Sequence, residues 1–245
     1  MITRPHLAQG DFLLLFCSIL WGASFALTHG AVSSLPIMGV VGLRFLIAAI
    51  LLLLINPKSK MSLSKRELTA GIAIGFTMFA GYGAQAESLA YLEPGQTAFI
   101  EALYVPLVPI AQFALFPRQV KKPGYRMIIC ITLAFFGLLL ISGIGHHSFT
   151  LSPGLVFAII DAFAITMEII LVAKFAADID PAKLGFVQCT TVAVLAGLIF
   201  LCNDRGISSP PLTAVAITVL LGGFSALLQP AMNFAMKTVS ATRAV

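Results

Sequence analysis

The feature that most constrains this chain is a series of uninterrupted apolar segments, each about twenty residues long. As an α-helix that rises about 1.5 Å per residue, such a segment crosses the ~30 Å hydrocarbon core of a bilayer. Inside hydrocarbon the backbone must satisfy its own hydrogen bonds, which only helices and closed barrels achieve. Barrel strands alternate apolar and polar residues, whereas these runs are continuous. The sequence therefore predicts membrane-spanning helices at residues 12–29, 36–55, 69–91, 97–116, 125–143, 153–174, 184–202 and 214–236.

The composition excludes a soluble domain. Hydrophobic residues make up 59% of the 245 residues and charged residues only 10%, whereas soluble domains carry about a quarter charged residues. The connections are short and rich in turn residues, such as Pro94-Gly95 and Pro153-Gly154. All four cysteines lie within apolar runs and their spacing fits neither a disulfide framework nor a zinc site. We therefore expect no metal site and no cofactor.

The distribution of lysine and arginine predicts the orientation in the membrane, because cytoplasmic loops carry an excess of both. With a cytoplasmic N-terminus, all but two of the 15 Lys and Arg residues face the cytoplasm; Arg205 lies outside and Arg44 lies within a span. We therefore expect a multi-pass protein of the cell membrane, cytoplasmic or inner, with its N-terminus in the cytoplasm. The net charge of +5 then reflects topology and attraction to anionic membrane lipid, not nucleic-acid binding.

The two halves of the chain resemble each other weakly. An offset of about 142 residues places Trp21-Gly22 over Phe163-Ala164, and one of 145 places Pro36 over Pro181. The first three spans then correspond to the sixth, seventh and eighth, and this odd shift reverses their direction through the membrane. We expect an all-α membrane protein, an inverted repeat of two five-helix units at 10–145 and 152–245, as in many secondary transporters. Residue 245 corresponds to residue 100, so the second unit is expected to be incomplete, with about eight complete helices of ten.

Several short motifs occur in the order found in one known family. They are 19–25 (ILWGASF), 42–45 (GLRF), 87–91 (ESLAY), 96–100 (QTAFI), 103–106 (LYVP) and 239–244 (VSATRA). With these motifs the sequence resembles the drug/metabolite transporter (DMT) superfamily, specifically its EamA type. The resemblance implies two five-helix inverted repeats and carriers that move small polar metabolites or drugs, often outward.

Ionisable residues within the spans are candidate functional residues, because a charge at the bilayer centre costs about 2.5–3.5 kcal/mol on insertion scales. The candidates for a substrate or ion pathway are Arg44, Asp161, Glu168, Glu101 and Glu87, with Trp21, which is the only tryptophan and lies mid-span. Arg44 and Asp161 lie near the midplane in different halves, so we expect them to pair. The alternative is that these groups only hold helices together, that the glutamates at 87 and 101 reach the interface, or that Trp21 is simple packing.

Other residues within the spans predict local features of the helices. Pro106 and Pro109 are expected to kink the fourth span, and Pro230 the eighth. The pairs Gly71–Gly75 and Gly22–Ala26 are typical of close helix contacts. Residues 81–86 (GYGAQA) match a dinucleotide-binding fingerprint formally, but they lie inside a span, so we reject that interpretation.

Taken together, these features predict a secondary transporter, an exporter of small polar metabolites or drugs that works by alternating access and is a candidate for proton coupling. Its expected partners are membrane lipid, a small-molecule substrate and, as one arrangement, a second copy in a homodimer. One alternative is a truncated inactive relative or a non-transporting membrane subunit. Another is an intramembrane enzyme using Asp161 and Glu168, which is disfavoured because carboxylates ~10 Å apart along a helix cannot act together on one bond. We expect the chain not to be an enzyme.

Overall fold

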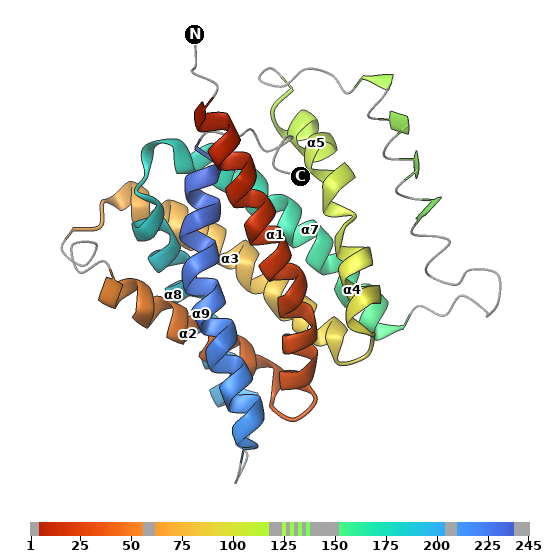
Figure 1. The fold of residues 1–245 in the computed structure, drawn as a ribbon, viewed down its shortest axis with the longest axis vertical. Coiled ribbons are helices and arrows are strands. Elements are labelled where there is room, and N and C mark those ends of the chain that lie inside the picture. Colours follow the sequence, from red (N-terminus) through yellow and green to blue (C-terminus); the bar gives the residue numbers. More distant parts are fainter. Residues whose placement is uncertain are drawn as a thin grey trace.

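The computed structural model describes residues 5–55, 62–117, 124–125, 128–129, 132–133, 136–137, 152–203 and 210–237, with side chains described from residue 12. Every regular element in these ranges is helical (Figure 1). In chain order the elements are α1 (Pro5–Val32), α2 (Ile37–Ile55), α3 (Lys65–Leu89), α4 (Pro94–Glu101), α5 (Tyr104–Leu115), α7 (Pro153–Phe175), the short 3₁₀ turn η2 (Ala176–Asp178), α8 (Pro181–Asn203) and α9 (Leu212–Ala235).

Six helical segments in the described residues are long and apolar enough to cross a membrane. They coincide with six predicted spans and cover Phe12–Val32, Ile37–Ile55, Pro94–Leu115, Pro153–Asp178, Pro181–Asn203 and Leu212–Ala235. The predicted span 69–91 forms α3, a helix of 25 residues, whose glycines, threonines and Gln85 dilute its apolar character. The predicted span 125–143 lies mostly outside the described residues. The protein is thus an all-α multi-pass membrane protein.

The regular α-helical hydrogen bonding of the fourth predicted span is interrupted between Glu101 and Tyr104. Ala102 and Leu103 keep right-handed helical dihedral angles, but tighter hydrogen bonds to the third preceding residue divide the apolar segment Pro94–Leu115 into the two short helices α4 and α5. Pro106 has no N–H, so it cannot donate to the carbonyl of Ala102 four residues earlier. The amide of Val105 donates to that carbonyl instead, at 3.1 Å, and this tighter turn marks the break. By contrast, α9 continues through Pro230 as one helix.

The helices pack mainly across the two halves of the chain. Contacts join α1 with α9, α2 with both α8 and α9, and α3 with both α7 and α8, while α4 and α5 pack against α7. In Figure 1 the blue α9 accordingly lies beside the red α1, although they come from opposite ends of the sequence. Packing within the first half is much sparser.

Two glycines allow the closest of these approaches. A Cβ at Gly71 would lie 2.5 Å from the Cβ of Val187, and one at Gly75 would lie 2.6 Å from the Cβ of Thr191. These distances are shorter than any van der Waals contact, so α3 can meet α8 this closely only where it has no side chain. The predicted role of the Gly71–Gly75 pair is confirmed. The prediction for Gly22 is wrong, because a Cβ there would meet nothing within 4 Å.

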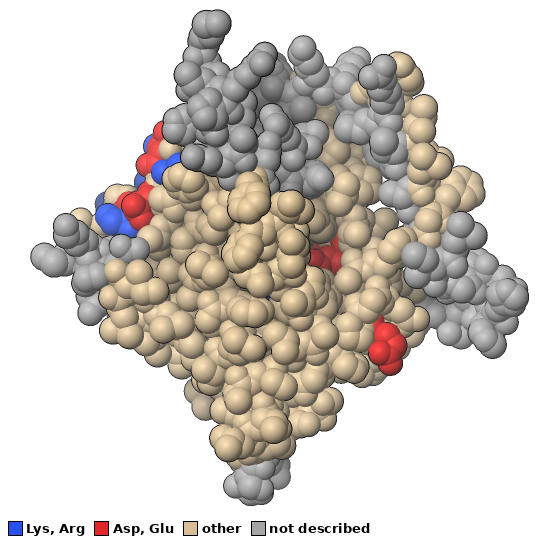
Figure 2. Space-filling view, in the orientation of Figure 1, with Lys and Arg blue, Asp and Glu red and all other residues tan. Residues whose placement is uncertain are grey.

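Different polar contacts occur at the two ends of the bundle. At one end Arg66 pairs with Asp178 at 2.7 Å, and Lys183 pairs with Glu67 at 3.5 Å. Figure 2 shows acidic and basic side chains gathered at one edge of a face that is otherwise mostly uncharged. At the other end, His29 Nδ1 lies 2.8 Å from the carbonyl oxygen of Leu89. Segments predicted to lie on one side of the membrane are therefore neighbours in space.

Candidate functional site

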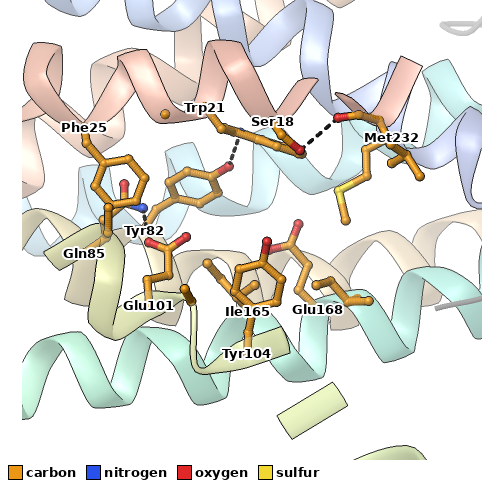
Figure 3. A pocket seen from close by; sticks show the side chains of 15 residues that line it. Ser18, Trp21, Phe25, Tyr82, Gln85, Glu101, Tyr104, Ile165, Glu168 and Met232 are labelled. Atoms are coloured by element: carbon orange, nitrogen blue, oxygen red, sulfur yellow. Dashed lines mark hydrogen bonds between the residues drawn. The ribbon is translucent and has the colours of Figure 1, made fainter. Parts of the chain in front are cut away.

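A cavity of about 220 Å³ lies inside the bundle, between α1, α3, α4, α5, α7 and α9 (Figure 3). Figure 2 shows acidic atoms at the bottom of a hollow in the same apolar face. Its walls combine aromatic, aliphatic and polar side chains from both halves of the chain. The lining residues are Leu14, Ser18, Trp21, Gly22, Phe25, Tyr82, Gln85, Ala98, Glu101, Ala102, Tyr104, Ile165, Glu168, Ile169 and Met232.

Two of the predicted carboxylates face this cavity. Glu101, at the end of α4, is 8% exposed and accepts a hydrogen bond from Gln85 Nε2 at 2.8 Å. Glu168, on α7, is 4% exposed and points into the cavity (Figure 3). Among the described residues, Glu168 has no hydrogen-bond or ion-pair partner.

Trp21 also lines the cavity, as one reading of the sequence predicted. Its Nε1 donates a hydrogen bond to the hydroxyl of Tyr82 at 3.1 Å. The amide of Gln229, on α9, donates to the same hydroxyl at 3.3 Å. Side chains from α1, α3 and α9 are therefore tied together at one oxygen on the cavity wall.

Arg44 lies behind this wall and does not line the cavity. It is buried in α2, and its Nε donates to the hydroxyl of Ser225 on α9 at 2.7 Å. Its guanidinium carbon lies 4.8 Å from the ring centroid of Tyr82 and 5.3 Å from that of Phe45. A cation this close to aromatic rings is stabilised by the ring quadrupole. Nη2 has no hydrogen-bond partner among the described residues.

Asp161 is fully buried on α7, also outside the cavity lining. Neither of its carboxylate oxygens accepts a hydrogen bond from an amide, hydroxyl or basic group in the described part of the chain, but its carboxyl group lies close enough to that of Glu101 for the two to share a hydrogen bond. A Cβ at Gly81 would lie 3.3 Å from Oδ1, so the carboxylate rests against the bare backbone of α3. Its electrostatic neighbours are the carboxylates of Glu101 and Glu168.

The predicted pairing of Arg44 with Asp161 is wrong. The ion pairs among the described residues are those of Arg66 with Asp178 and of Lys183 with Glu67. Arg44 instead points toward α3 and α9, where Ser225 and Tyr82 hold it. Equal depth in the membrane places two residues at one level, but the direction in which each helix face points decides whether they meet.

The remaining candidate, Glu87, is half-buried on α3 and is not part of the cavity lining. The sequence interpretation did not select several polar residues of the site, chiefly Tyr82, Gln85, Ser225 and Gln229. Tyr82 and Gln85 fall within the rejected 81–86 motif, and Gln229 precedes the proline of α9. A polar side chain in mid-span was the signal available for all four, because each must find a partner away from water.

Comparison with known proteins gives a consistent result. Residues 8–143 match the model of the EamA-like transporter family. A protein of Archaeoglobus fulgidus described as an uncharacterized transporter is 24% identical over 218 residues, which cover 88% of this chain and 66% of that protein. The chain thus spans just under two thirds of that relative. One solved crystal structure has a TM-score of 0.67 at 17% identity, covering 96% of this chain and 81% of that one, which supports the fold. By its match to the family model over more than half its length, this chain belongs to the EamA-like transporter family.

Proposed function

We propose that this chain acts as a secondary carrier that moves small polar molecules through the central cavity by alternating access. The observation that carries the proposal is the cavity itself, in which acidic and polar side chains from both halves meet inside an apolar bundle. Glu101 and Glu168 lie within candidate membrane spans, where a charge at the bilayer centre costs about 2.5–3.5 kcal/mol on insertion scales. Glu168 forms no hydrogen bond or ion pair with the described residues that would offset this cost. A role in ligand binding therefore explains its position better than a role in holding helices together.

The helix pairing supports an inverted repeat with units at 10–145 and 152–245. The proposed symmetry exchanges α1 with α7, α2 with α8 and α3 with α9. Under this exchange the α1–α9 contact becomes α7–α3, the α2–α9 contact becomes α8–α3, and the α2–α8 contact maps onto itself. A two-fold axis between α2 and α8 would produce this pattern. In such carriers the substrate site lies near the midplane where the repeats meet.

The proposed direction of transport is outward, and the proposed orientation places the N-terminus in the cytoplasm. The position of Arg66 and Lys183 at the same end of the bundle supports placing that end in the cytoplasm. Single cysteines at positions 121 and 147, in a cysteine-free background, should then react from opposite sides of the membrane. Reaction of both with an impermeant reagent outside intact cells would contradict this orientation.

Proton coupling is the finer part of the proposal. Asp161 and Glu101 are buried neighbours whose carboxyl groups lie within hydrogen-bonding reach of each other, and Asp161 accepts no hydrogen bond from any other group among the described residues. Two adjacent carboxyl groups in a low-dielectric site hold a shared proton at lower cost than two negative charges. Because Glu101 also lines the cavity, a substrate there can change the proton occupancy of the pair.

The experiment compares metabolites inside and outside cells that express the chain with those of cells expressing a Glu101→Gln, Glu168→Gln double variant at equal level. At least one small polar metabolite should accumulate outside only when the unaltered chain is present. The matched control is Glu87→Gln, which alters a span carboxylate outside the cavity lining and should retain export. If no metabolite differs between the cells, the chain is a non-transporting relative or subunit instead.

A further inference from the structure

We infer that the cavity binds a compact organic cation of the alkylated ammonium class, with Glu168 as its counter-ion. The inference rests on the proposed carrier function and names the class of molecule carried. Four observations support it: the charge balance of the interior, the unpartnered state of Glu168, the aromatic walls, and the cavity volume.

The charged residues buried in the described part of the chain do not balance. They are one base, Arg44, and three acids, Glu101, Asp161 and Glu168. Arg44 interacts electrostatically with Glu101, and the proton shared by Asp161 and Glu101 removes a second negative charge, which leaves Glu168 as the carboxylate without a basic partner. Buried charges without partners are costly, and a cation reduces that cost. The interior therefore favours a positively charged ligand and disfavours an anionic one.

Glu168 is the group best placed to meet that cation. The amide of Gln85 occupies one oxygen of Glu101, and Asp161 lies outside the lining. Glu168 is 4% exposed, has no hydrogen-bond or ion-pair partner within the described ranges, and is directed into the cavity (Figure 3). A buried acceptor without a partner in the protein is what a ligand's positive group would satisfy.

The cavity also has aromatic walls suited to a soft cation. Trp21, Phe25, Tyr82 and Tyr104 all line it. Figure 3 shows Trp21 on one side and Glu168 with Tyr104 on the other. Arg44 already lies over the ring of Tyr82, so Trp21, Phe25 and Tyr104 remain for a ligand. Aromatic rings bind alkylated ammonium groups through cation–π attraction, most strongly at tryptophan.

The volume and the donor set restrict the ligand further. About 220 Å³ is below the ~300–1,000 Å³ of pockets that hold drug-sized molecules, so the ligand is compact. Among the described residues, no three His, Cys, Asp or Glu side chains are grouped as in a metal site. One free carboxylate among aromatic rings suits a bulky monocation better than a hard metal ion, which needs six or more oxygen ligands.

The test uses the only tryptophan of the chain, Trp21, as a reporter inside the cavity. The purified full chain in lipid nanodiscs is titrated with tetramethylammonium chloride, with tert-butanol as the uncharged molecule of similar shape and sodium chloride as the ionic control. Only tetramethylammonium should give a saturable change in Trp21 fluorescence. Glu168→Gln should weaken this response at least tenfold, whereas Glu87→Gln should leave it within twofold. Thermal unfolding of each variant verifies that it is folded.

Equal responses to tetramethylammonium and tert-butanol, or no saturable response to tetramethylammonium, would overturn the inference without relying on any variant. Undiminished affinity in folded Glu168→Gln would also overturn it. Flux measured in proteoliposomes separates this result from the proposed function. Binding of the cation without flux of any solute contradicts the carrier function but still supports the cation-binding site. Flux of neutral or anionic solutes without any response to the cation supports the carrier function and contradicts the cation-binding site.

Discussion

The indole nitrogen of Trp21 donates a hydrogen bond to the hydroxyl of Tyr82 at 3.1 Å, and this contact joins α1 to α3 on the wall of the cavity. Gln229 donates to the same hydroxyl from α9. The ring of Tyr82 also supports the guanidinium of Arg44. One side chain on α3 thus positions groups from three other helices, so its polar and aromatic parts can be tested separately.

Tyr82→Phe keeps the ring beside Arg44 but removes the acceptor of two hydrogen bonds. Because it leaves two largely buried donors without this partner, we expect the free energy of unfolding to fall by about 1–3 kcal/mol. Chemical denaturation followed by Trp21 fluorescence measures this loss, and the emission of the folded state should shift as the indole loses its partner. Tyr91→Phe is the control, since Tyr91 is 59% exposed. Equal losses for both variants would contradict the prediction.

Gly75→Ala should destabilise the protein through the α3–α8 contact. The added Cβ would lie 2.6 Å from the Cβ of Thr191, so one helix has to move away. Overpacking of this kind costs about 1–3 kcal/mol, occasionally more. The matched control is Gly22→Ala, where nothing lies within 4 Å and alanine improves helix propensity by about 1 kcal/mol. The melting temperatures should therefore fall for Gly75→Ala and hold or rise for Gly22→Ala; the opposite order would refute the close contact.

Ser225→Ala tests the partner of Arg44. Removing the hydroxyl leaves the buried Nε without its 2.7 Å acceptor, so we expect a loss of about 1.5–3 kcal/mol, as for hydrogen bonds to charged groups. In an Arg44→Met background the same substitution should cost much less, because no donor is then stranded. A double-mutant cycle on unfolding free energies measures this coupling. Additive losses would mean that the two side chains do not interact in the folded protein.

Stability should depend on pH through Glu67, at the charged end of the bundle. The backbone N–H of Ser64 donates to this carboxylate at 2.7 Å and, with the Ser64 hydroxyl and Lys183, holds the pKa of Glu67 below its ordinary value of 4.5. A carboxyl with a depressed pKa in the folded state stabilises the protein fully above its unfolded pKa, and this contribution disappears as the pH falls through the folded pKa. Acidification below pH 4.5 should therefore lower the melting temperature of the unaltered chain more than that of Glu67→Gln. A melting temperature that falls by the same amount in both chains would refute this role of Glu67.

Asp161→Asn should abolish the pH dependence of transport while the protein stays folded. The titratable groups that face Asp161 are Glu101 of α4 and Glu168 of its own helix, and α3 meets it with Gly81. An amide keeps the shape of the carboxyl group but cannot exchange the shared proton. Flux into proteoliposomes, measured across a range of pH, should become flat in this variant. A pH profile identical to that of the unaltered chain would exclude Asp161 from coupling.

The sequence predicted the helices well because their determinants are local. Uninterrupted apolar length defines six of the spans, and proline and serine mark their starts, as where the Ser152 hydroxyl accepts from the amide of Leu155 at the beginning of α7. The Gly71–Gly75 pair was likewise visible as a spacing. The break between α4 and α5 was only partly predictable, because Pro106 removes a bond to Ala102 but does not determine whether the helix bends or separates.

The site was less predictable because it depends on which way each helix face points. Depth placed Arg44 and Asp161 at one level, yet Arg44 meets Ser225 and Asp161 meets the backbone at Gly81. Glu101 and Glu168, selected because charges are costly within a span, both line the cavity, and their place in a substrate or ion pathway stays a prediction. Tyr82 was not selected, since a tyrosine among glycines has no sequence pattern that marks it as the point where several helices meet.

The packing of α2 and α3 against α7, α8 and α9 determines the order in which the protein can assemble. During synthesis the first helices enter the bilayer well before their neighbours exist. Arg44 has no hydrogen-bond acceptor at Ser225 until that residue, 181 positions further along the chain, has been synthesised. The surface without side chains at Gly71 and Gly75 likewise has no packing partner until α8 has been inserted. Neither half can therefore reach its native packing alone, and the newly made N-terminal half must be shielded by lipid, water or a chaperone until translation of α9 is complete.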